Sequence, residues 1–505
     1  MNNFEQGREE EKCIDFKSNV IKTNLTDCYI IEENRFGDPR GHFTSVTDNQ
    51  LEGLGFKDFK QKSESLSCKG VVRGLHFQKD PYCQAKVVCC TKGKVLDVVV
   101  DLRKDSPTYK QYTYVELTPE NGRMLFVPRG FAHGFVALED NTTFNYLVDN
   151  KYYPRLDGGI PWNDPEINIP WDDIFKEYGI DEPLLSEKDQ NHKKLSEANL
   201  DFVREPKRFL VTGVKGQLGY DIVRELNERG EYDILALDRD EMDITDKEQV
   251  MKIVKAYKPD VIFHCAAWTA VDKAQELVDA CTQVNVEGTR NMTDASIEVG
   301  AKLIYMSTDY VFDGKKTLDE LYKEDDIPNP QSVYGKTKFE GEEEVRRNPK
   351  HFITRISWVF GINGNNFIKT MLKAADKHDV LTVVNDQIGS PTYTVDLAKL
   401  LVEMAYTEKY GTYHVNNEGY CSWAEFAQYI MEINGKSTKI KPLTTEEYYA
   451  DKDTTYVAYR PRNSKLDKSK LEENFYRLPS WQDATDRYCK ELKKSNKWLY
   501  IENNK

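Results

Sequence analysis

The sequence predicts two domains of different fold class, an all-β domain followed by an α/β domain. Before about residue 200, short runs alternate polar and apolar residues between Gly, Asn and Pro turn signals, which is typical of an antiparallel sandwich or barrel. After that point, buried strand runs alternate with helical segments, as in a parallel sheet covered by helices. The length of 505 residues is too great for one core and, on its own, suggests about three domains.

The first half contains strand-like segments that are rich in Val, Tyr, Thr and Phe, and helical periodicity is scarce there. We expect strands within residues 28–36, 41–48, 85–103, 112–118, 122–140 and 142–149. The stretch from Ser186 to Lys207 is polar and charged and is predicted to connect the two domains. We therefore assign residues 1–204 to the first domain and residues 205–505 to the second.

The second half opens with a regular alternation of strands and helices. We expect strands within residues 208–213, 232–238, 261–267, 302–312 and 351–361. Helices are predicted over residues 216–230, which end in a glycine, and over residues 246–260, where Pro259 follows the last periodic positions. This order predicts a parallel sheet with helices on its faces.

The composition is that of a globular protein, with 39% hydrophobic and 11% aromatic residues. A net charge of −14 argues against a general nucleic-acid surface, so we expect no nucleic-acid partner. The ten cysteines lack the paired CxxC spacing of a structural zinc site and are expected to be reduced thiols. The N-terminus is charged, and no apolar run is long enough to cross a bilayer, so we expect a cytoplasmic protein without a membrane partner.

The first chemical motif of the second half is the glycine-rich segment VTGVKGQLG, residues 211–219. Gly213, Gly216 and Gly219 lie between a predicted strand and a predicted helix, where missing side chains let a pyrophosphate approach the helix N-terminus. The spacing GxxGxxG is a weaker signal than GxGxxG, and ordinary turn glycines are the alternative. The next strand ends in Asp238 and Arg239; the acid suits the ribose of NAD, whereas the arginine suits the extra phosphate of NADP.

The second motif is SVYGKTK, residues 332–338, which places Tyr334 and Lys338 four residues apart and thus on one helix face. Tyrosine has an ordinary pKa of about 10, and a nearby ammonium group lowers that pKa by favouring the phenolate. Thr308, at the end of a predicted strand, offers a hydroxyl to the same carbonyl oxygen. A YxxxK spacing also occurs by chance in helices, but its place after the glycine motif and STDYVF makes it specific.

The second half resembles a known enzyme family through several motifs, which are VTGVKGQLG, CAAWTAVDKAQ, VNVEGT, STDYVFDG, SVYGKTKFEGE, RISWVFGINGNNFIKTML, NDQIGSPTYTVDLA, GTYHVNNEG and YRPRNSKLD. With these motifs, residues from about 207 to 500 resemble the dTDP-4-dehydrorhamnose reductases, which are extended short-chain dehydrogenases/reductases. The resemblance implies an α/β Rossmann fold with a small C-terminal substrate subdomain. It also implies reduction of a C4 ketone by hydride transfer from NADPH, with NADH as the alternative.

The reductase resemblance further implies a set of site residues. The catalytic residues are Thr308, Tyr334 and Lys338, with Lys338 lowering the tyrosine pKa. Together with Asp238 and Arg239, the cofactor-binding residues are Gly213, Gly216, Gln217, Leu218, Gly219, Asp243, Ile244, Ala266, Ala267, Asn285, Tyr334 and Lys338. The candidate substrate residues are Asp309, Trp358, Asn366 and Arg460, of which the last three are equally open to a structural role.

One local feature bears on the type of reaction in this half. Related sugar-nucleotide dehydratases carry an Asp-Glu pair after the threonine, whereas here Asp309 is followed by Tyr310. Reduction is therefore favoured over dehydration.

The strand-rich half contains two histidines in notable surroundings, His76 in VVRGLHFQ and His133 in PRGFAHGF. Two histidines on a β-barrel suggest a metal site, but the close HxH pair that such a site normally has is missing. A lone strand histidine is more often a satisfied core residue than a catalyst. The residues around the histidines decide between these readings.

Those surroundings are GDPRGHF, KGVVRGLHFQ, AKVV, GKVLDVVVDLR, SPTYKQY, VPRGFAHGF, YLVDNKYYP, GIPWNDPEINIPW and LLSEKDQN. Together they resemble the dTDP-4-dehydrorhamnose 3,5-epimerases over about residues 25 to 192. The resemblance implies a cupin-like jelly roll that uses no metal. It implies His76 as the base, Asp189 as its orienting carboxylate, Lys86 near the C4 oxygen and Tyr146 as the acid on the opposite face.

The same resemblance places Arg40, Gln61, Arg73 and His133 in the nucleotide or sugar site. The chain departs from the family pattern at Ser63, where the family has asparagine, and at Asp157, where it commonly has glutamate. These departures affect the nucleotide contacts more than the proton chemistry. Protons at C3 and C5 are removable because both carbons flank a ketone, so a base, a cation near the enolate oxygen and an acid on the other face are required.

The two resemblances together predict one bifunctional enzyme, an isomerase joined to an oxidoreductase of nucleotide-L-rhamnose biosynthesis. It epimerises dTDP-4-keto-6-deoxy-D-glucose at C3 and C5 and then reduces the C4 ketone to give dTDP-L-rhamnose. The alternatives are the same reactions on a UDP-linked sugar, or a non-catalytic NADP-binding regulatory subunit. We also expect a homodimer, by resemblance of the first half.

Overall fold

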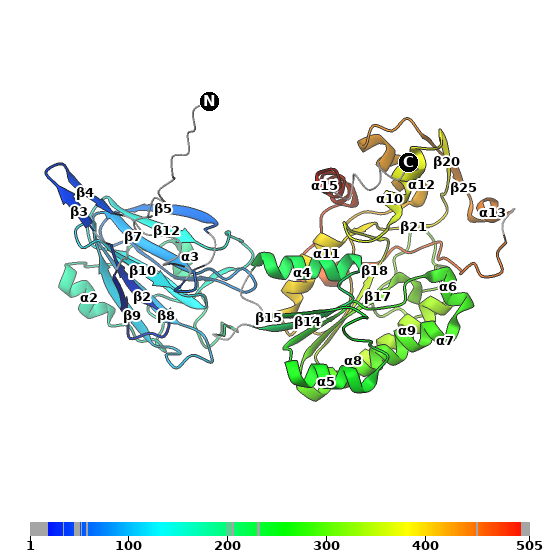
Figure 1. The fold of residues 1–505 in the computed structure, drawn as a ribbon. Helices are drawn as coiled ribbons and strands as arrows, with labels where there is room; N and C mark the ends of the chain where they lie inside the picture. The colour runs from blue at the N-terminus through cyan, green and yellow to red at the C-terminus, as the bar shows by residue number, and fades with distance from the viewer. Residues whose placement is uncertain are drawn as a thin grey trace, which may run out of the picture. The chain divides into compact units, whose positions relative to one another are not determined.

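The computed structural model describes residues 19–33, 35–44, 51, 53–56, 59–198, 200, 202–203, 207–229, 233–450 and 453–495. The chain divides into two compact units, Met1–Glu205 and Pro206–Lys505. The domain boundary predicted between residues 204 and 205 lies outside the described residues. Figure 1 labels many of the elements of both units.

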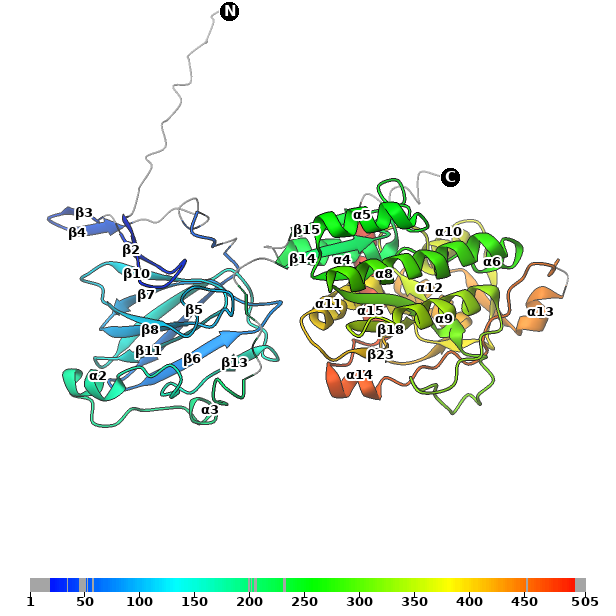
Figure 2. The same cartoon turned by 90° about the horizontal axis from the view of Figure 1, so that it is seen from below.

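The first unit is built from two antiparallel sheets. The six-stranded sheet has the order β1-β2-β10-β7-β12-β5, and the five-stranded sheet has the order β13-β6-β11-β8-β9. A further hairpin, β3–β4, projects from the two sheets (Figure 2). The strands of this unit are β1 Asn19–Lys22, β2 Tyr29–Glu32, β3 Arg35–Asp38, β4 Gly41–Thr44, β5 Gln61–Ser67, β6 Val72–Gln78, β7 Lys86–Lys92, β8 Val95–Asp101, β9 Tyr112–Leu117, β10 Arg123–Val127, β11 Phe131–Ala137, β12 Thr142–Val148 and β13 Asp157–Gly159. The all-β prediction for this half is confirmed.

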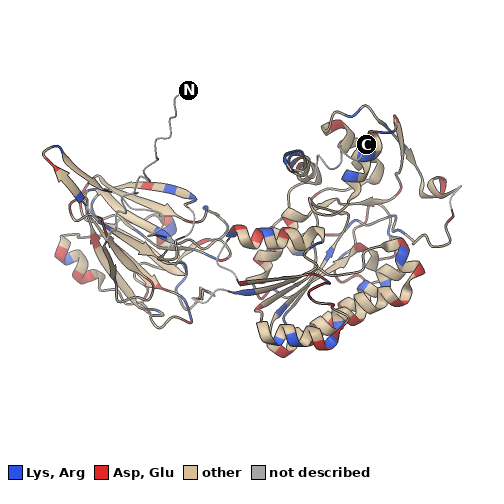
Figure 3. Cartoon of the chain, viewed as in Figure 1, with Lys and Arg blue, Asp and Glu red and all other residues tan. Residues whose placement is uncertain are grey.

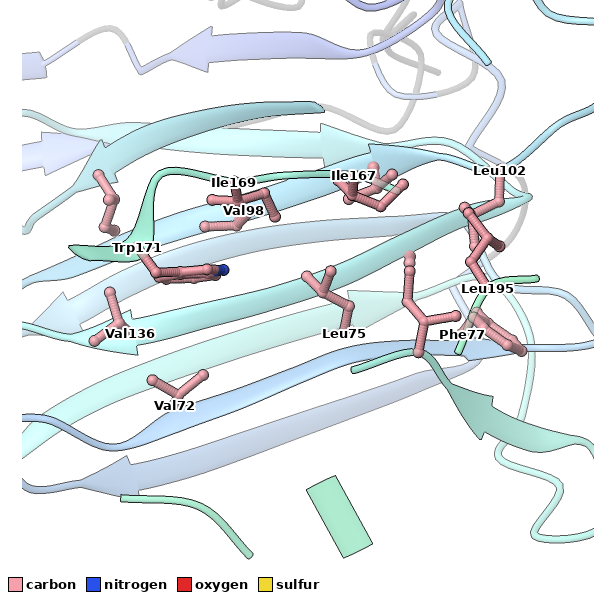
Figure 4. Packing of buried hydrophobic residues seen from close by; sticks show 14 of the residues in the cluster. Val72, Leu75, Phe77, Val98, Leu102, Val136, Ile167, Ile169, Trp171 and Leu195 are labelled. Carbon is pink, nitrogen blue, oxygen red and sulfur yellow. The ribbon is translucent and has the colours of Figure 1, made fainter. Parts of the chain in front are cut away.

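Apolar side chains fill the space between the two sheets and also cover the outer face of the five-stranded sheet. The inner cluster includes Val88, Val99, Phe135 and Phe144. The outer cluster packs strand residues against Trp171 and its neighbours, as Figure 4 shows. Strand β8, buried on both faces, is therefore apolar at nearly every position.

Strand β6 changes face within its length, and this change orients the candidate base. Val72, Leu75 and Phe77 all point into the outer cluster. Since side chains alternate along a strand, the interval of three between Val72 and Leu75 requires an irregularity. The pairing of β6 with β11 does shift its register beside this point, between His133 and Phe135. His76, between Leu75 and Phe77, consequently faces the space between the sheets.

The segment predicted as a connector belongs largely to the first unit, so that part of the prediction is wrong. Residues Glu187–Gln190 form the short helix α3, and Leu195, Leu200 and Phe202 are buried in the outer cluster. Apolar residues spaced through a charged stretch fold it back onto the sheet. A helix that was not predicted, α2 at Trp171–Tyr178, covers the same face and ends at Gly179 in the left-handed conformation.

The second unit contains a six-stranded parallel sheet in the order β15-β14-β16-β17-β18-β23. Its strands are β14 Arg208–Thr212, β15 Asp233–Leu237, β16 Val261–His264, β17 Lys302–Thr308, β18 His351–Ile356 and β23 Gly411–His414. The chain passes from β14 to β15 on one side and then to β16 on the other. This reversal of direction opens a crevice at the carboxyl ends of the strands, where ligands bind in such sheets.

Helices cover both faces of this sheet (Figure 1). One face is covered by α4 Gln217–Arg229 and α11 Thr394–Ala405, and the other mainly by α5 Lys247–Tyr257, α8 Thr289–Val299 and α9 Val333–Val345. Shorter helical elements join them, namely α6 Val271–Glu276, α7 Val278–Thr282, the π-helix η1 Gln283–Gly288 and the 3-10 helix η2 Asp309–Val311. The predicted α/β architecture is confirmed. Acidic and basic residues are interspersed along these helices, as Figure 3 shows.

The remainder of the second unit surrounds a separate apolar cluster that includes Phe360, Phe426 and Trp481. Small two-stranded sheets pair β19 with β22, β20 with β25 and β21 with β24. The elements are β19 Val359–Phe360, α10 Phe367–Ala375, β20 Val380–Val384, β21 Ile388–Gly389, β22 Thr392–Tyr393, β24 Cys421–Ser422, α12 Trp423–Ile433, β25 Lys439–Leu443, α13 Thr445–Tyr449, α14 Ser469–Asn474 and α15 Trp481–Lys494. Nine cysteines within the described residues are free thiols. Among the helices of those residues, none combines the length and the apolar character that a membrane span requires.

Candidate functional sites

The first candidate site lies between the two sheets of the first unit, and its central contact joins His76 to Asp189. The Nε2 atom of His76 is hydrogen-bonded to Asp189 Oδ1. Ser186 caps α3: its Oγ accepts from the Asp189 N–H at 3.1 Å and donates to Asp189 Oδ2 at 2.8 Å. The carboxylate is therefore fixed from both sides. The His76 side chain remains 31% exposed, against 4% for Asp189, so the imidazole is accessible.

The charge on Asp189 sets the tautomer of His76. Burial raises the pKa of this carboxyl, but the hydrogen bond and charge of His76 outweigh burial, and the pKa lies below its ordinary value. An ionised carboxylate only accepts hydrogen bonds, so the His76 proton sits on Nε2. The Nδ1 lone pair is left as the basic atom.

A second histidine–carboxylate pair lies beside the first. His133 on β11 is the cross-strand partner of His76 on β6. The Nε2 atom of His133 lies 2.8 Å from Asp97 Oδ1, and both side chains are fully buried. Burial lowers the pKa of His133 and raises that of Asp97. Sequence reasoning did not select Asp97, although a carboxylate flanked by apolar residues in VLDVVV was a usable signal.

Lys86 and Tyr146 come from the opposite sheet. Lys86 begins β7, and Tyr146 lies on the adjacent strand β12. The Tyr146 ring meets the His133 ring edge-on, with 6.0 Å between centroids. Burial lowers the pKa of Lys86, partly offset by Asp97 and Asp157, and burial raises the pKa of Tyr146. Tyr146 therefore keeps its proton at neutral pH, as a proton donor must.

The predicted nucleotide residues are placed less uniformly. Arg73 donates from Nε to Ser67 Oγ at 3.2 Å on the edge strand β5. Gln61, on the same strand, accepts from the Tyr152 N–H at 3.1 Å and donates to Ser63 Oγ at 3.2 Å. Arg40 lies at the turn of the projecting β3–β4 hairpin, where its 89% exposed side chain pairs with Asp38. The structure does not bring Arg40 to the His76 group.

The second candidate site is a cavity of about 890 Å³ at the switch point of the parallel sheet. Nearly all residues predicted to bind the cofactor line it. They are Gly213, Gly216, Gln217, Leu218, Gly219, Asp238, Arg239, Asp243, Ile244, Ala266, Ala267, Tyr334 and Lys338. Thr308, Asp309 and Trp358 line the same cavity, as do Tyr310 and Trp423, which sequence reasoning did not select.

The glycine-rich turn fits a dinucleotide because side chains are excluded from it. Gly213 has a φ of +68°, and a Cβ there would lie 2.8 Å from the Ala266 nitrogen. A Cβ on Gly219 would lie 2.4 Å from the Gly213 carbonyl oxygen. Helix α4 begins at Gln217, immediately after this turn, so its free N–H groups face the cavity edge where a pyrophosphate binds.

The far end of the cavity displays both charge types predicted for the cofactor ribose. Asp238 accepts from the Lys215 N–H at 2.8 Å and from the Arg239 N–H at 2.7 Å. The Arg239 side chain is 84% exposed and lies 3.6 Å from Asp243. Backbone N–H groups thus fix the Asp238 carboxylate, while the exposed Arg239 side chain can pair with a phosphate on the cofactor ribose.

The catalytic trio converges from two elements. Thr308 ends β17, and Tyr334 and Lys338 lie in the first turns of α9, whose start is capped by Ser332. The Nζ atom of Lys338 lies 4.0 Å from the centre of the Tyr305 ring. Burial lowers the pKa of Lys338 to about 7. Burial also raises the pKa of Tyr334, against a hydrogen bond with Thr308 that lowers it. The expected lowering of the tyrosine pKa is therefore wrong for this structure, since desolvation dominates.

Asn285 does not line the cavity but hydrogen-bonds to the helix that carries Tyr334 and Lys338. It lies in the π-helix η1, fully buried, and its Oδ1 accepts from the Trp268 N–H at 2.8 Å. Its Nδ2 donates to Thr337 Oγ1 at 3.1 Å, on the same helix as Tyr334. A π-helical turn is a frequent feature of functional sites.

The remaining candidate substrate residues differ in exposure to the cavity. Trp358 stacks on Trp423, with 3.6 Å between ring centroids, and both indoles line the cavity. Asn366 caps α10 and donates to Gln217 Oε1 at 3.2 Å, so its amide is used inside the protein. Arg460 binds Asp272 at 2.8 Å. Neither Asn366 nor Arg460 is among the residues that line the cavity.

Comparisons with known proteins match the two units separately. Residues 207–494 match the family described as the RmlD substrate binding domain, and residues 22–197 match the dTDP-4-dehydrorhamnose 3,5-epimerase family. A dTDP-4-dehydrorhamnose reductase of Aggregatibacter actinomycetemcomitans is 44% identical over 287 residues, which are 55% of this chain and 96% of the relative. A dTDP-4-dehydrorhamnose 3,5-epimerase of Shigella flexneri is 45% identical over 184 residues, which are 36% of this chain and 98% of the relative.

A solved structure gives the same match for the second unit. The crystal structure of a dTDP-4-dehydrorhamnose reductase from Bacillus anthracis, in complex with NADP, is 41% identical with a TM-score of 0.54. The match covers 57% of this chain and 99% of that one.

Proposed function

Because the chain belongs to the dTDP-4-dehydrorhamnose 3,5-epimerase family through its first unit and to the RmlD substrate binding domain family through its second, we propose that it is a bifunctional enzyme of dTDP-L-rhamnose biosynthesis. The first unit epimerises dTDP-4-keto-6-deoxy-D-glucose at C3 and C5. The second unit reduces the C4 ketone of the product. The contact that most strongly supports the first activity is the His76–Asp189 pair, and the tyrosine–lysine pair over the cavity supports the second.

In the epimerisation, His76 removes the protons next to the ketone. Asp189 holds the imidazole with its proton on Nε2, so Nδ1 accepts the proton from C3 or C5. Lys86 stabilises the negative charge that develops on the C4 oxygen, since its ammonium group lies within electrostatic range of Asp97 and His133 in this site. Tyr146, protonated at neutral pH, returns a proton from the opposite face and inverts the centre. We assign Arg73, Gln61 and His133 to binding of the sugar nucleotide.

In the reduction, the residues of this chain position the ketone and supply its proton. When bound, the nicotinamide cofactor supplies the hydride for C4. Thr308 and Tyr334 hydrogen-bond the C4 oxygen, and Tyr334 donates its phenolic proton to it. Lys338 stabilises the tyrosinate that remains and holds the nicotinamide ribose. Asp309 and the stacked Trp358 and Trp423 line the part of the cavity that receives the sugar. Arg460 lies in the C-terminal part of the same unit.

The cavity and the relatives also favour one cofactor and one substrate nucleotide. We propose NADPH, because Arg239 is exposed at the ribose end of the cavity and the Bacillus anthracis relative was crystallised with NADP. NADH is the alternative that Asp238 favours. The names of the relatives refer to dTDP-linked sugars and give no support to the UDP alternative.

We further propose that the first unit has a jelly-roll topology, that the C-terminal cluster around Phe360 serves substrate binding, and that the protein is a cytoplasmic homodimer. A non-catalytic regulatory subunit is disfavoured because the base, the acid, the tyrosine and the lysine are all present. Copies that lose activity usually lose such residues first.

One experiment tests both activities in the full chain. The protein is incubated with dTDP-4-keto-6-deoxy-D-glucose in D₂O, with and without NADPH, and the sugar is followed by NMR. We expect deuterium at C3 and C5 without cofactor, and the L-rhamnose configuration at C3, C4 and C5 with it.

Two variants separate the units. His76→Ala is expected to abolish both deuterium uptake and cofactor oxidation with this substrate. Tyr334→Phe is expected to abolish cofactor oxidation only. Loss of deuterium uptake in the tyrosine variant would contradict the division of labour between the units.

A further inference from the structure

The first site contains a third residue, His192, that the proposed chemistry does not use. Its Nε2 atom lies 3.5 Å from Asp189 Oδ1, and its ring is 5.5 Å from the His76 ring in an edge-on arrangement. The side chain is only 9% exposed. Among the residues that the structure describes, Asp189 is the ion-pair partner of this Nε2 atom, and their contact is too long for a strong hydrogen bond. A buried imidazole nitrogen held only by such a long contact is free to take a closer ligand.

The backbone beside His192 is shaped to admit its imidazole. Gly159 on β13 is the cross-strand partner of His76 on β6. A Cβ at Gly159 would lie 2.6 Å from His192 Nε2 and 2.7 Å from the Leu75 carbonyl oxygen. A side chain there would displace the imidazole from the Asp189 carboxylate. The position of His192 therefore depends on a glycine in a different element.

We propose that His76, Asp189 and His192 form a binding site for a divalent transition-metal ion such as Zn²⁺, and that its occupation switches off the epimerase unit. The inhibition rests on the proposed role of His76 as the base. The ligand atoms Nε2 of His76, Oδ1 of Asp189 and Nε2 of His192 all lie within 4.8 Å of one another. Two imidazoles and one carboxylate are a common ligand set for Zn²⁺ with one open position.

The geometry requires only small movements. Ligand bonds of about 2.0–2.2 Å in a tetrahedral site separate the ligand atoms by about 3.3 Å. The Asp189–His192 separation of 3.5 Å already meets this value. The two imidazole nitrogens, within 4.8 Å of each other, need to come closer, and the short His76–Asp189 contact needs to lengthen, by rotation of the side chains.

Metal binding removes the base. In the metal-free site the His76 proton lies on Nε2 and the Nδ1 lone pair accepts the substrate proton. A metal ion on Nε2 replaces that proton, which moves through solvent to Nδ1, so no net proton is released. The Nδ1 atom then has an N–H group and no lone pair. Proton removal from C3 and C5 stops, while the reductase unit is unaffected.

The test measures metal binding and proton exchange separately. Metal-free protein is titrated with Co²⁺, whose visible absorption reports a tetrahedral site, and with Zn²⁺, while deuterium uptake at C3 and C5 is followed without NADPH. We expect Zn²⁺ to suppress deuterium uptake by at least about tenfold and a chelator to restore it. His192→Gln should retain deuterium uptake without metal and weaken Zn²⁺ inhibition by more than about 100-fold.

The controls distinguish the two proposals. His378→Gln removes an exposed histidine of the second unit and should leave Zn²⁺ inhibition unchanged. Equal inhibition of the wild type and His192→Gln, or no Co²⁺ spectrum and no inhibition in the wild type, would overturn the metal site. Absence of deuterium uptake in metal-free wild type would instead overturn the proposed function. If His192→Gln fails to fold, His192→Asn is used for the same comparison.

Discussion

Tyr334 and Lys338 show how burial, rather than charge alone, sets the chemistry of single residues. Both side chains face the cavity, and burial raises the pKa of the phenol while it lowers that of the ammonium group to about 7. A protonated phenol is the form that reduction of a ketone consumes. Sequence spacing predicted that the two residues belong to one site, and both line the cavity, but it did not predict the direction of the tyrosine pKa, because desolvation depends on the completed fold.

The pKa of Lys338 predicts the pH dependence of cofactor capture. The charged form predominates below pH 7 and is lost as the pH rises through about 7. We expect kcat/KM for NADPH, which reports the free enzyme, to fall by up to about tenfold per pH unit above that value. Steady-state kinetics from pH 6 to 9 measure it. Lys338→Arg keeps its charge and should move the fall to higher pH, and an unchanged profile in that variant would contradict the assignment.

Two other residues of the sites were not selected from the sequence, because their roles depend on partners far along the chain. Asp97 and His192 gain their significance from partners on other elements, His133 and the His76–Asp189 pair. Asn366, conversely, matched a family motif but is used to cap α10. A single sequence shows which residue types are present, whereas the direction of each side chain depends on packing.

At the scale of elements, the strand–turn–helix unit from β14 to α4 is the best predicted part of the chain. The space for an added side chain differs among Gly213, Gly216 and Gly219. A Cβ on Gly219 would meet backbone atoms at 2.4 and 2.9 Å, whereas one on Gly216 would meet a single oxygen at 3.1 Å. Gly213, with its positive φ, and Gly219 therefore tolerate no side chain, whereas Gly216 is less restricted.

This difference predicts the outcome of two alanine substitutions. Gly219→Ala should weaken NADPH binding by at least about tenfold, because the turn and the start of α4 must move apart. Gly216→Ala should change binding by less than about threefold. Fluorescence titration with NADPH measures both. Similar effects of the two substitutions would mean that the close approach of Gly219 to Gly213 is not what shapes the turn.

A second prediction concerns the ion pair that joins β18 to α9. Arg355 binds the Glu342 carboxylate through Nε at 2.9 Å and through Nη2 at 2.8 Å, and both side chains are fully buried. Arg355→Leu leaves a buried carboxylate without its main partner. We expect the free energy of unfolding of the second unit to fall by about 3–5 kcal/mol. The measurement is the midpoint of its unfolding transition, which is recognised because NADPH raises it.

Arg346 gives the matched control for that prediction. It contacts the same carboxylate at 3.1 Å from a partly exposed position at the C-cap of α9. Arg346→Leu should cost less than about 1 kcal/mol. If Arg346→Leu cost as much stability as Arg355→Leu, burial of the arginine would not determine how much its ion pair with Glu342 stabilises the unit.

Elements were predicted least well where the chain folds back on the first unit. Helix α2 was missed because its eight residues follow several proline and asparagine turn signals, which indicated a loop. The supposed connector packs Leu195, Leu200 and Phe202 onto the sheet, yet its charged residues dominate the sequence pattern. Strand β5 also escaped prediction, since its alternation is almost wholly polar on an edge strand.

At the scale of the whole molecule, the chain joins two units, each with a candidate site of its own. The inter-sheet site draws on residues of the first unit and the cavity on residues of the second. Linkage raises the local concentration of the intermediate around the second unit but does not by itself require direct transfer. The order of the two reactions follows from the shared ketone, which must survive until both neighbouring centres are inverted.

This independence predicts complementation between inactive variants. His76→Ala alone cannot form the reducible sugar, and Tyr334→Phe alone cannot reduce it. An equimolar mixture should recover NADPH oxidation after a lag, because the ketone made by one chain diffuses to the other. The lag should shorten as the concentration of Tyr334→Phe rises. No recovery at any concentration would indicate that the intermediate never leaves the chain that formed it.

The Trp358–Trp423 stack gives the second unit an intrinsic optical probe. These indoles line the cavity in which the reduced nicotinamide is proposed to bind. Indole emission overlaps the absorption of reduced nicotinamide. Excitation of the two indoles should therefore produce fluorescence from the bound dihydropyridine by resonance energy transfer. Cofactor docking can thus be watched in real time, without a label and before any sugar is added.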